Sequence, residues 1–183
     1  MVPEAKLVAA EHGLVPEGEG WFVLNAREAA WKGGTGLGAA VTFEGDVRFG
    51  QYGVNIQVLN PGEPNCMYHG EEDQEDFLVL TGECILIVES EERRLHAWDF
   101  VHCPPYTEHV FVGAGDGPCA ILMIGGRLGT GLIYPANETA LKHGAGVEET
   151  TSDGEVAYAF HPGDPPIPYR DGDLPDWSYS ARR

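Results

Sequence analysis

The stretch that decides the fold is residues 76–103, which read DFLVLTGECILIVESEERRLHAWDFVHC. Apolar runs of strand length follow one another here, separated by turn residues such as Gly82 and Ser90. The same rhythm continues on both sides, so we expect strands at VNIQVL (54–59), DFLVL (76–80), ECILIVE (83–89), RRLHA (93–97), DFVHC (99–103), HVFVG (109–113) and CAILMIG (119–125). Short strands spaced about eight to twelve residues apart predict an all-β fold, either an antiparallel sandwich or a barrel.

The chain has 183 residues, which at about 150 residues per domain predicts one domain. We expect the strand block to span residues 51–126, with an N-terminal extension (1–50) packing on it. Residues 127–183 are rich in proline and glycine toward their end and cannot form a core of their own, so we expect this tail to wrap around the barrel or else to fray.

Outside the strand block, residues 3–13 are expected to form a short amphipathic helix that ends at a glycine. A strand is expected at 21–24 and a second short helix at 135–143. The segment KGGTGLGAA (32–40) has the glycine spacing of a dinucleotide-binding loop. It leads into a strand-like run instead of a helix, which favours an ordinary loop.

The charge balance excludes two classes of partner. Asp and Glu number 29 against 11 Lys and Arg, a formal net charge of −18. Nucleic acids and anionic membranes both need clustered basic residues, so we expect neither as a partner. The sequence shows no secretory signal and no apolar run of about 18 residues, so a cytoplasmic location is expected. The four cysteines lack a C-x-x-C pair, and those at 84, 103 and 119 are expected to be reduced and buried.

Chemistry-bearing side chains gather in MYHGEEDQEDFLVLTGE (67–83) and WDFVHCPPYTEH (98–109). Alternate residues of a strand share a face, so His69 and Glu71 are expected to point the same way. Glu75 leads into the next strand, and His109 begins a later one after two prolines. Two histidines and a carboxylate with open positions form the ligand set of non-haem iron sites, and the set also suits zinc or manganese. His102 has the opposite parity to His109 and is expected to be a surface or hydrogen-bonding residue.

These two segments resemble the motifs of the cupin superfamily. The first motif runs Gly, then His-x-His, three or four residues, Glu, six residues and Gly. His69, Glu75 and Gly82 fit it from the histidine onward, with Glu71 where the second histidine usually lies, while Gly62 precedes His69 by one residue more than the pattern. The second motif runs Gly, five residues, Pro-x-Gly, two residues and His; WDFVHCPPYTEH keeps its spacing through to His109 but lacks both glycines. The resemblance implies a double-stranded β-helix (jelly-roll barrel) that pairs into a homodimer.

The resemblance also implies metal ligands at His69, Glu75 and His109, with Glu71 either a fourth ligand or a general base. Extra carboxylates favour iron(II), manganese(II) or zinc. Three or four ionisable groups in a small barrel are costly unless something such as a metal satisfies them. The pocket for a small-molecule ligand is expected to involve Gln74, Phe77 and Phe111.

Two classes of function remain open. The first is a metalloenzyme, for example a non-haem dioxygenase, an isomerase or a decarboxylase, acting on a small oxygen-rich molecule. The second is a barrel that binds or senses a small molecule without turnover. An anionic substrate would need local compensation from the metal or from Arg48, Arg93 or Arg94.

Overall fold

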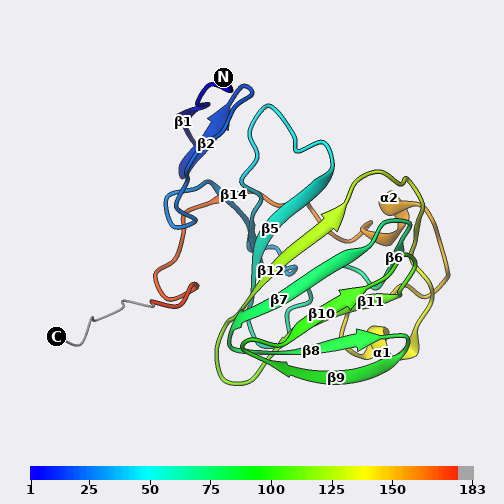
Figure 1. The fold of residues 1–183 in the computed structure, drawn as a ribbon. Coiled ribbons are helices and arrows are strands. Elements are labelled where there is room, and N and C mark those ends of the chain that lie inside the picture. Colours follow the sequence, from blue (N-terminus) through cyan, green and yellow to red (C-terminus); the bar gives the residue numbers. More distant parts are fainter. Residues whose placement is uncertain (177–183) are drawn as a thin grey trace.

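The computed structural model describes residues 1–176, and its regular secondary structure is mostly β (Figure 1). The larger sheet is antiparallel and has the order β10 (Phe100–Cys103), β7 (Glu75–Thr81), β12 (Cys119–Gly126), β5 (Tyr52–Leu59), β4 (Ala39–Val41), β3 (Trp31–Gly33) and β14 (Pro166–Ile167). The second sheet has the order β11 (His109–Ala114), β8 (Glu83–Val88) and β9 (Glu91–His96). Two short ribbons pair β1 (Lys6–Ala10) with β2 (Gly13–Glu17) and β6 (Gly70–Glu71) with β13 (Leu132–Ile133). The prediction of an all-β fold is confirmed, and each of the seven expected strands is present.

The main core lies between the two sheets. It is built from the inward-facing apolar side chains of both sheets, with Phe111, Ile121 and Val79 fully buried at its centre. The expected cysteines Cys84, Cys103 and Cys119 are buried there as free thiols. Runs such as CILIV are apolar at every position because their outer faces are also covered. On the outer side of β8 and β11, helix α1 (Glu138–Lys142) packs over Ile87 and Val110.

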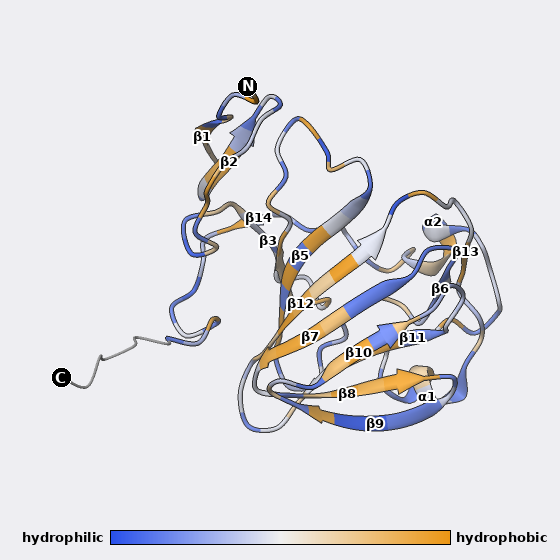
Figure 2. Cartoon of the chain, viewed as in Figure 1, coloured by the Kyte–Doolittle hydropathy of each residue, from blue (hydrophilic) through white to orange (hydrophobic). Residues whose placement is uncertain are grey.

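The interior of the barrel changes from apolar to polar along the strands. In the register of β5, β12 and β7, Gln57 lies in a row with Ile121 and Val79, and Asn55 lies in a row with Met123 and Phe77. The next row contains Gly53, Gly125 and Glu75. Figure 2 shows the same gradient along β7, which is hydrophilic at its start and hydrophobic toward its end. Polar groups therefore collect at one end of the barrel.

The expected helix over residues 3–13 is wrong. This segment forms the β1–β2 hairpin, in which Ala10 pairs with Gly13. The hairpin packs on residues 21–30 through backbone hydrogen bonds, including Leu14 N–H to Glu28 O at 2.8 Å. A segment of this length gains little from isolated helix formation, so pairing with neighbouring backbone decides its structure. The expected strand at 21–24 is reduced to a single bridge between Trp21 and Glu4.

The C-terminal part, described as far as residue 176, contains short helices and short strands. Helix α1 falls within the expected range, and the side chain of Asn137 caps it by accepting from Ala140 N–H at 3.0 Å. A short helix, α2 (Gly154–Ala157), follows. Strand β14 then pairs with β3, so the tail lies along the edge of the larger sheet. The rest of the tail, residues 177–183, lies outside the described residues. Helices long and apolar enough to cross a membrane are absent from residues 1–176.

Candidate metal centre

A cavity of about 420 Å³ opens at the polar end of the barrel. Strands β5, β7 and β12 form one wall through the rows described above. His69 and His109 line it as well, and an antiparallel bridge between their backbones holds these two residues side by side. The bridge consists of His109 N–H to His69 O at 2.8 Å and His69 N–H to His109 O at 3.1 Å. The two rings are 5.0 Å apart between centroids.

Each histidine ring is oriented by a backbone carbonyl. Nδ1 of His69 lies 2.8 Å from the carbonyl oxygen of Met67, and Nδ1 of His109 lies 2.9 Å from that of Thr107. A carbonyl oxygen only accepts, so both Nδ1 atoms carry the hydrogen and donate it. The Nε2 atoms are thereby left to face the cavity. Backbone acceptors at the far nitrogen are the usual partners of histidines that ligate metals.

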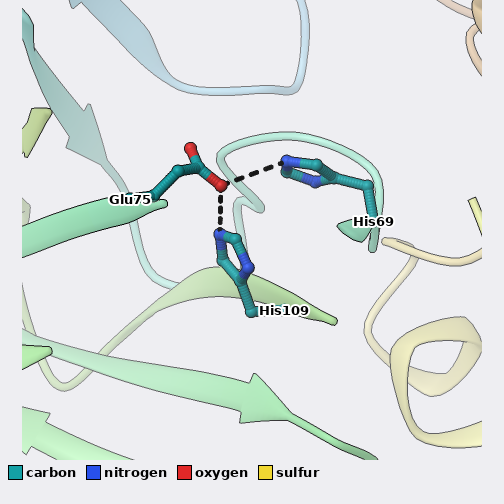
Figure 3. Close-up of side chains that lie close together, drawn as sticks. All are labelled: His69, Glu75 and His109. Atoms are coloured by element: carbon teal, nitrogen blue, oxygen red, sulfur yellow. Dashed lines mark ion pairs between the residues drawn. The ribbon is translucent and has the colours of Figure 1, made fainter. Parts of the chain in front are cut away.

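Glu75 completes the group from the start of β7 (Figure 3). Its Oε2 lies 3.3 Å from Nε2 of His109 and 3.8 Å from Nε2 of His69. Gly125 on β12 pairs with Glu75, and a Cβ there would lie in van der Waals contact with Glu75 Oε1, 3.4 Å away. One ligand atom from each of the three residues lies within 4.8 Å of the others, so the group could hold a metal ion.

Glu71 stands beside this group on β6. Its Oε1 lies 3.4 Å from Nε2 of His69, and its side chain is 34% exposed, against 15% for Glu75. It lines the cavity but lies outside the three-residue group. The structure thus brings together all four predicted ligands, while a ligand role for Glu71 stays a prediction.

Burial and mutual charge set the ionisation of the four side chains. Burial, together with the charge of Glu71, raises the pKa of Glu75 to about 7. A hydrogen bond from His69 lowers the pKa of Glu71. Burial and the neighbouring His69 lower the pKa of His109 to about 4. Burial works against a charge on His69, but Cys66 and the two carboxylates raise its pKa well above the usual value. Two close carboxylates beside two imidazoles form a donor set that a divalent cation would neutralise.

The predicted pocket residues divide into two groups. Phe77 lines the cavity, with its ring 5.1 Å from that of His109. Gln74 does not line the cavity, because Glu75 takes the inward position. The Gln74 amide instead donates a hydrogen bond to Asp76 at 3.0 Å. Phe111 also lies outside the lining, fully buried deeper in the core with its ring 4.7 Å from that of Phe77.

Several residues that line the cavity are not among those predicted from the sequence. Asn55 and Gln57 could have been found, because they alternate with apolar residues along VNIQVL and so share a face. Tyr134 and Tyr158 line the cavity from the C-terminal part, where no local pattern indicates an inward position. Arg127 also lines it, directly after β12.

The remaining candidates lie elsewhere. His102 is on the outer face of the sheet, where its Nδ1 lies 2.7 Å from Asp76 Oδ1, as expected for a hydrogen-bonding surface residue. Arg93 pairs with Glu91, and Arg94 pairs with Glu83 at 2.5 Å, so both are engaged on the outer strands. They and Arg48 lie outside the cavity lining.

The fold and the site define an antiparallel β-barrel protein with a His/Glu/His group at its polar end. Residues 55–125 match the family model of the cupin domain, so this chain carries a cupin domain across those residues. No curated protein matches the sequence significantly.

Three solved structures are similar in fold. The polyketide cyclase RemF from Streptomyces resistomycificus has 12% sequence identity and a TM-score of 0.52, over 61% of this chain and 84% of that one. A protein from Acidithiobacillus ferrooxidans assigned as a sugar phosphate isomerase has 23% identity and a TM-score of 0.49, over 54% of this chain and 64% of that one. A sugar phosphate isomerase of the cupin superfamily from Silicibacter pomeroyi has 20% identity and a TM-score of 0.48, over 57% of this chain and 74% of that one. At these identities the likeness concerns the fold.

Proposed function

We propose that this protein is a metal-dependent cupin enzyme that holds iron(II), manganese(II) or zinc at His69, Glu75 and His109. The observation that carries the proposal is the orientation of the two imidazoles. Their Nδ1–H groups are bound to the carbonyls of Met67 and Thr107, and their Nε2 atoms converge on one oxygen of Glu75. Side chains held this way need little rearrangement to receive a cation.

The donor set supports a divalent metal of intermediate hardness. Imidazole nitrogens suit zinc and iron, and each carboxylate shifts the preference toward harder ions such as manganese. When bound, such an ion supplies Lewis-acid or redox chemistry to a small oxygen-rich molecule. Oxygenase, isomerase and decarboxylase reactions all fall within this description.

Glu71 is the residue best placed to move a proton. Its lowered pKa keeps it a carboxylate at neutral pH. It lines the cavity, and with a side chain 34% exposed it can exchange protons with solvent. A general base must be ionised within reach of the bound molecule, and the lowered pKa makes this carboxylate a weaker base than an ordinary one. We therefore assign Glu71 as the base that takes a proton from the bound molecule.

The direct test is elemental analysis of protein purified without a metal-chelating resin. We expect stoichiometric metal in the wild type and in His102→Ala, whose imidazole lies outside the cavity. His69→Ala and His109→Ala should lose it. A wild type without metal, or variants that retain it fully, would contradict the site.

The role of Glu71 needs a separate measurement. The wild type and Glu71→Gln, both loaded with iron(II), are screened for turnover of small diols, thiols and keto acids, with oxygen uptake recorded. As a base, Glu71 should be dispensable for metal content but needed for turnover. Loss of metal in Glu71→Gln would make it a ligand instead.

A further inference from the structure

The wall of the cavity formed by β5 carries two amide side chains that the metal site does not use. Asn55 and Gln57 are two residues apart on one strand, so they face the same side, and both line the cavity. Asn55 lies in the same row as Met123, and Gln57 lies in the same row as Ile121. Both rows lie deeper in the barrel than the row that contains Glu75.

The orientation of the Gln57 amide is fixed by its partners. Its Nε2 donates to the carbonyl oxygens of Leu37 and Asn65, each at 2.8 Å. Both partners only accept, which places the nitrogen toward them and the oxygen away. Within residues 1–176 no group donates to Oε1, and this oxygen is not among the buried unpaired atoms. Gln57 therefore presents an open hydrogen-bond acceptor to the cavity.

The side-chain amide of Asn55 also has an unused hydrogen-bonding atom. Its Oδ1 is the one buried side-chain polar atom in the described part of the chain that lacks a partner. Burying a polar amide atom without a partner is unfavourable, so native proteins keep few of them. The residue lines the cavity, so a ligand group that enters there lies beside this amide. A hydroxyl group suits either end of an amide because it donates and accepts.

Away from the proposed metal, the basic side chains around the cavity offer no free partner to an anionic ligand. Of the lysines and arginines in residues 1–176, Arg127 alone lines the cavity. Its guanidinium is held by both carboxylate oxygens of Glu44, at 2.6 and 3.0 Å, and donates to Phe49 O at 3.1 Å. Glu71 and Glu75 add negative charge to the lining. A phosphate or carboxylate group would find no unpaired basic side chain here.

We propose that β5 recognises the substrate of this cavity, and that the substrate is a small uncharged polyhydroxyl compound whose hydroxyl groups bind Gln57 Oε1 and the Asn55 amide. This inference rests on the proposed function and names its substrate class. Recognition through buried acceptors discriminates strongly, because an analogue without the hydroxyl leaves them unpaired.

The test measures binding to the zinc-loaded protein by calorimetry and saturation-transfer NMR. The probes are erythritol, ribitol and mannitol, each beside the α,ω-diol of the same chain length, with ribitol phosphate as the anionic probe. We expect at least one polyol to bind tenfold or more tightly than its diol and than ribitol phosphate. Asn55→Leu and Gln57→Met should each weaken that polyol about tenfold. Gln74→Leu, an amide outside the cavity lining, is the matched control and should bind as the wild type does.

Metal content is recorded for every variant, which separates this inference from the proposed function. If the wild type holds no metal, the metal site fails, and polyol binding by β5 is then decided with the metal-free protein. If metal is held but the diols or ribitol phosphate bind as well as the polyols, the substrate class is wrong. Unchanged polyol binding in Asn55→Leu overturns the role of β5. That variant suffices should Gln57→Met fail to fold, because the Asn55 Oδ1 has no hydrogen bond within residues 1–176 for the substitution to remove.

Discussion

Replacing Glu75 by glutamine should stabilise the metal-free protein at alkaline pH. Glu75 has its pKa raised from 4.5 to about 7 by burial and by the charge of Glu71. Because ionisation is less favourable in the folded state, the carboxylate destabilises the fold increasingly as the pH rises from 4.5 toward 7, and fully above 7. At 1.36 kcal/mol per pKa unit, this shift corresponds to about 3 kcal/mol. Glutamine keeps the shape and removes the charge.

The assay is thermal unfolding of the wild type and Glu75→Gln in the presence of a chelator, at pH 4 and at pH 8. For a chain of this size, about 3 kcal/mol corresponds to a rise of roughly 6–12 °C in Tm at pH 8. At pH 4 the wild-type carboxyl is protonated in both states, so the two proteins should unfold together.

Glu71→Gln provides a control of opposite sign. The pKa of Glu71 is lowered by the hydrogen bond from His69, so its charge stabilises the fold above the ordinary carboxyl pKa, and this contribution is lost as the pH falls. Its removal should lower Tm at pH 8. Adding zinc should make the wild type more stable than Glu75→Gln at pH 8, because the wild type gains the free energy of metal binding and Glu75→Gln gains little. Equal stabilities of wild type and Glu75→Gln at pH 8 without metal would refute the reasoning.

Three further substitutions test the framework around the site. Phe111→Ala removes a fully buried ring and should cost about 3–5 kcal/mol in chemical denaturation, while metal content stays at the wild-type level. Gly13→Ala places a Cβ 2.5 Å from the backbone of Ala29, so it should detach the β1–β2 hairpin, seen as faster amide exchange there but not in the barrel. Asn137→Ala removes the cap that accepts from Ala140 N–H and should lower stability by about 1 kcal/mol in urea unfolding.

The strands of the barrel could be predicted from the sequence because most of them are apolar or alternating runs bounded by turn residues. Their order could not be predicted from local pattern, because β8 and β9 pair as sequence neighbours whereas β7 pairs with β10 and β12, and β5 with β12. The N-terminal hairpin could not be predicted in the same way. Residues 3–13 have no strong local preference, and their pairing is decided by contact with residues 21–30.

The residues of the site also differ in whether the sequence predicts them. His69, Glu75 and His109 could be predicted because their spacing in the sequence resembles the cupin motifs, and the structure brings their ligand atoms within 4.8 Å of one another. Gln74 and Phe111 were placed in the pocket by proximity in sequence, whereas the inward parity of Glu75 and the depth of Phe111 exclude them. The contribution of Tyr134 depends on the chain folding back after β12, a long-range event that no local pattern records.

The ion pair between Glu44 and Arg127 shows that the cavity depends on residues outside the segment that matches the family model. Residues 55–125 match the family model, but Glu44 and Leu37 lie before that segment and Arg127 lies after it. A domain trimmed to residues 55–125 would keep the histidines but lose both Glu44 and Arg127, together with the Leu37 carbonyl oxygen that accepts from Gln57. Such a fragment would lack the charged pair at the cavity and one of the two partners that orient the Gln57 amide. The flanking segments thus complete a cavity wall that the segment matching the family model leaves unfinished.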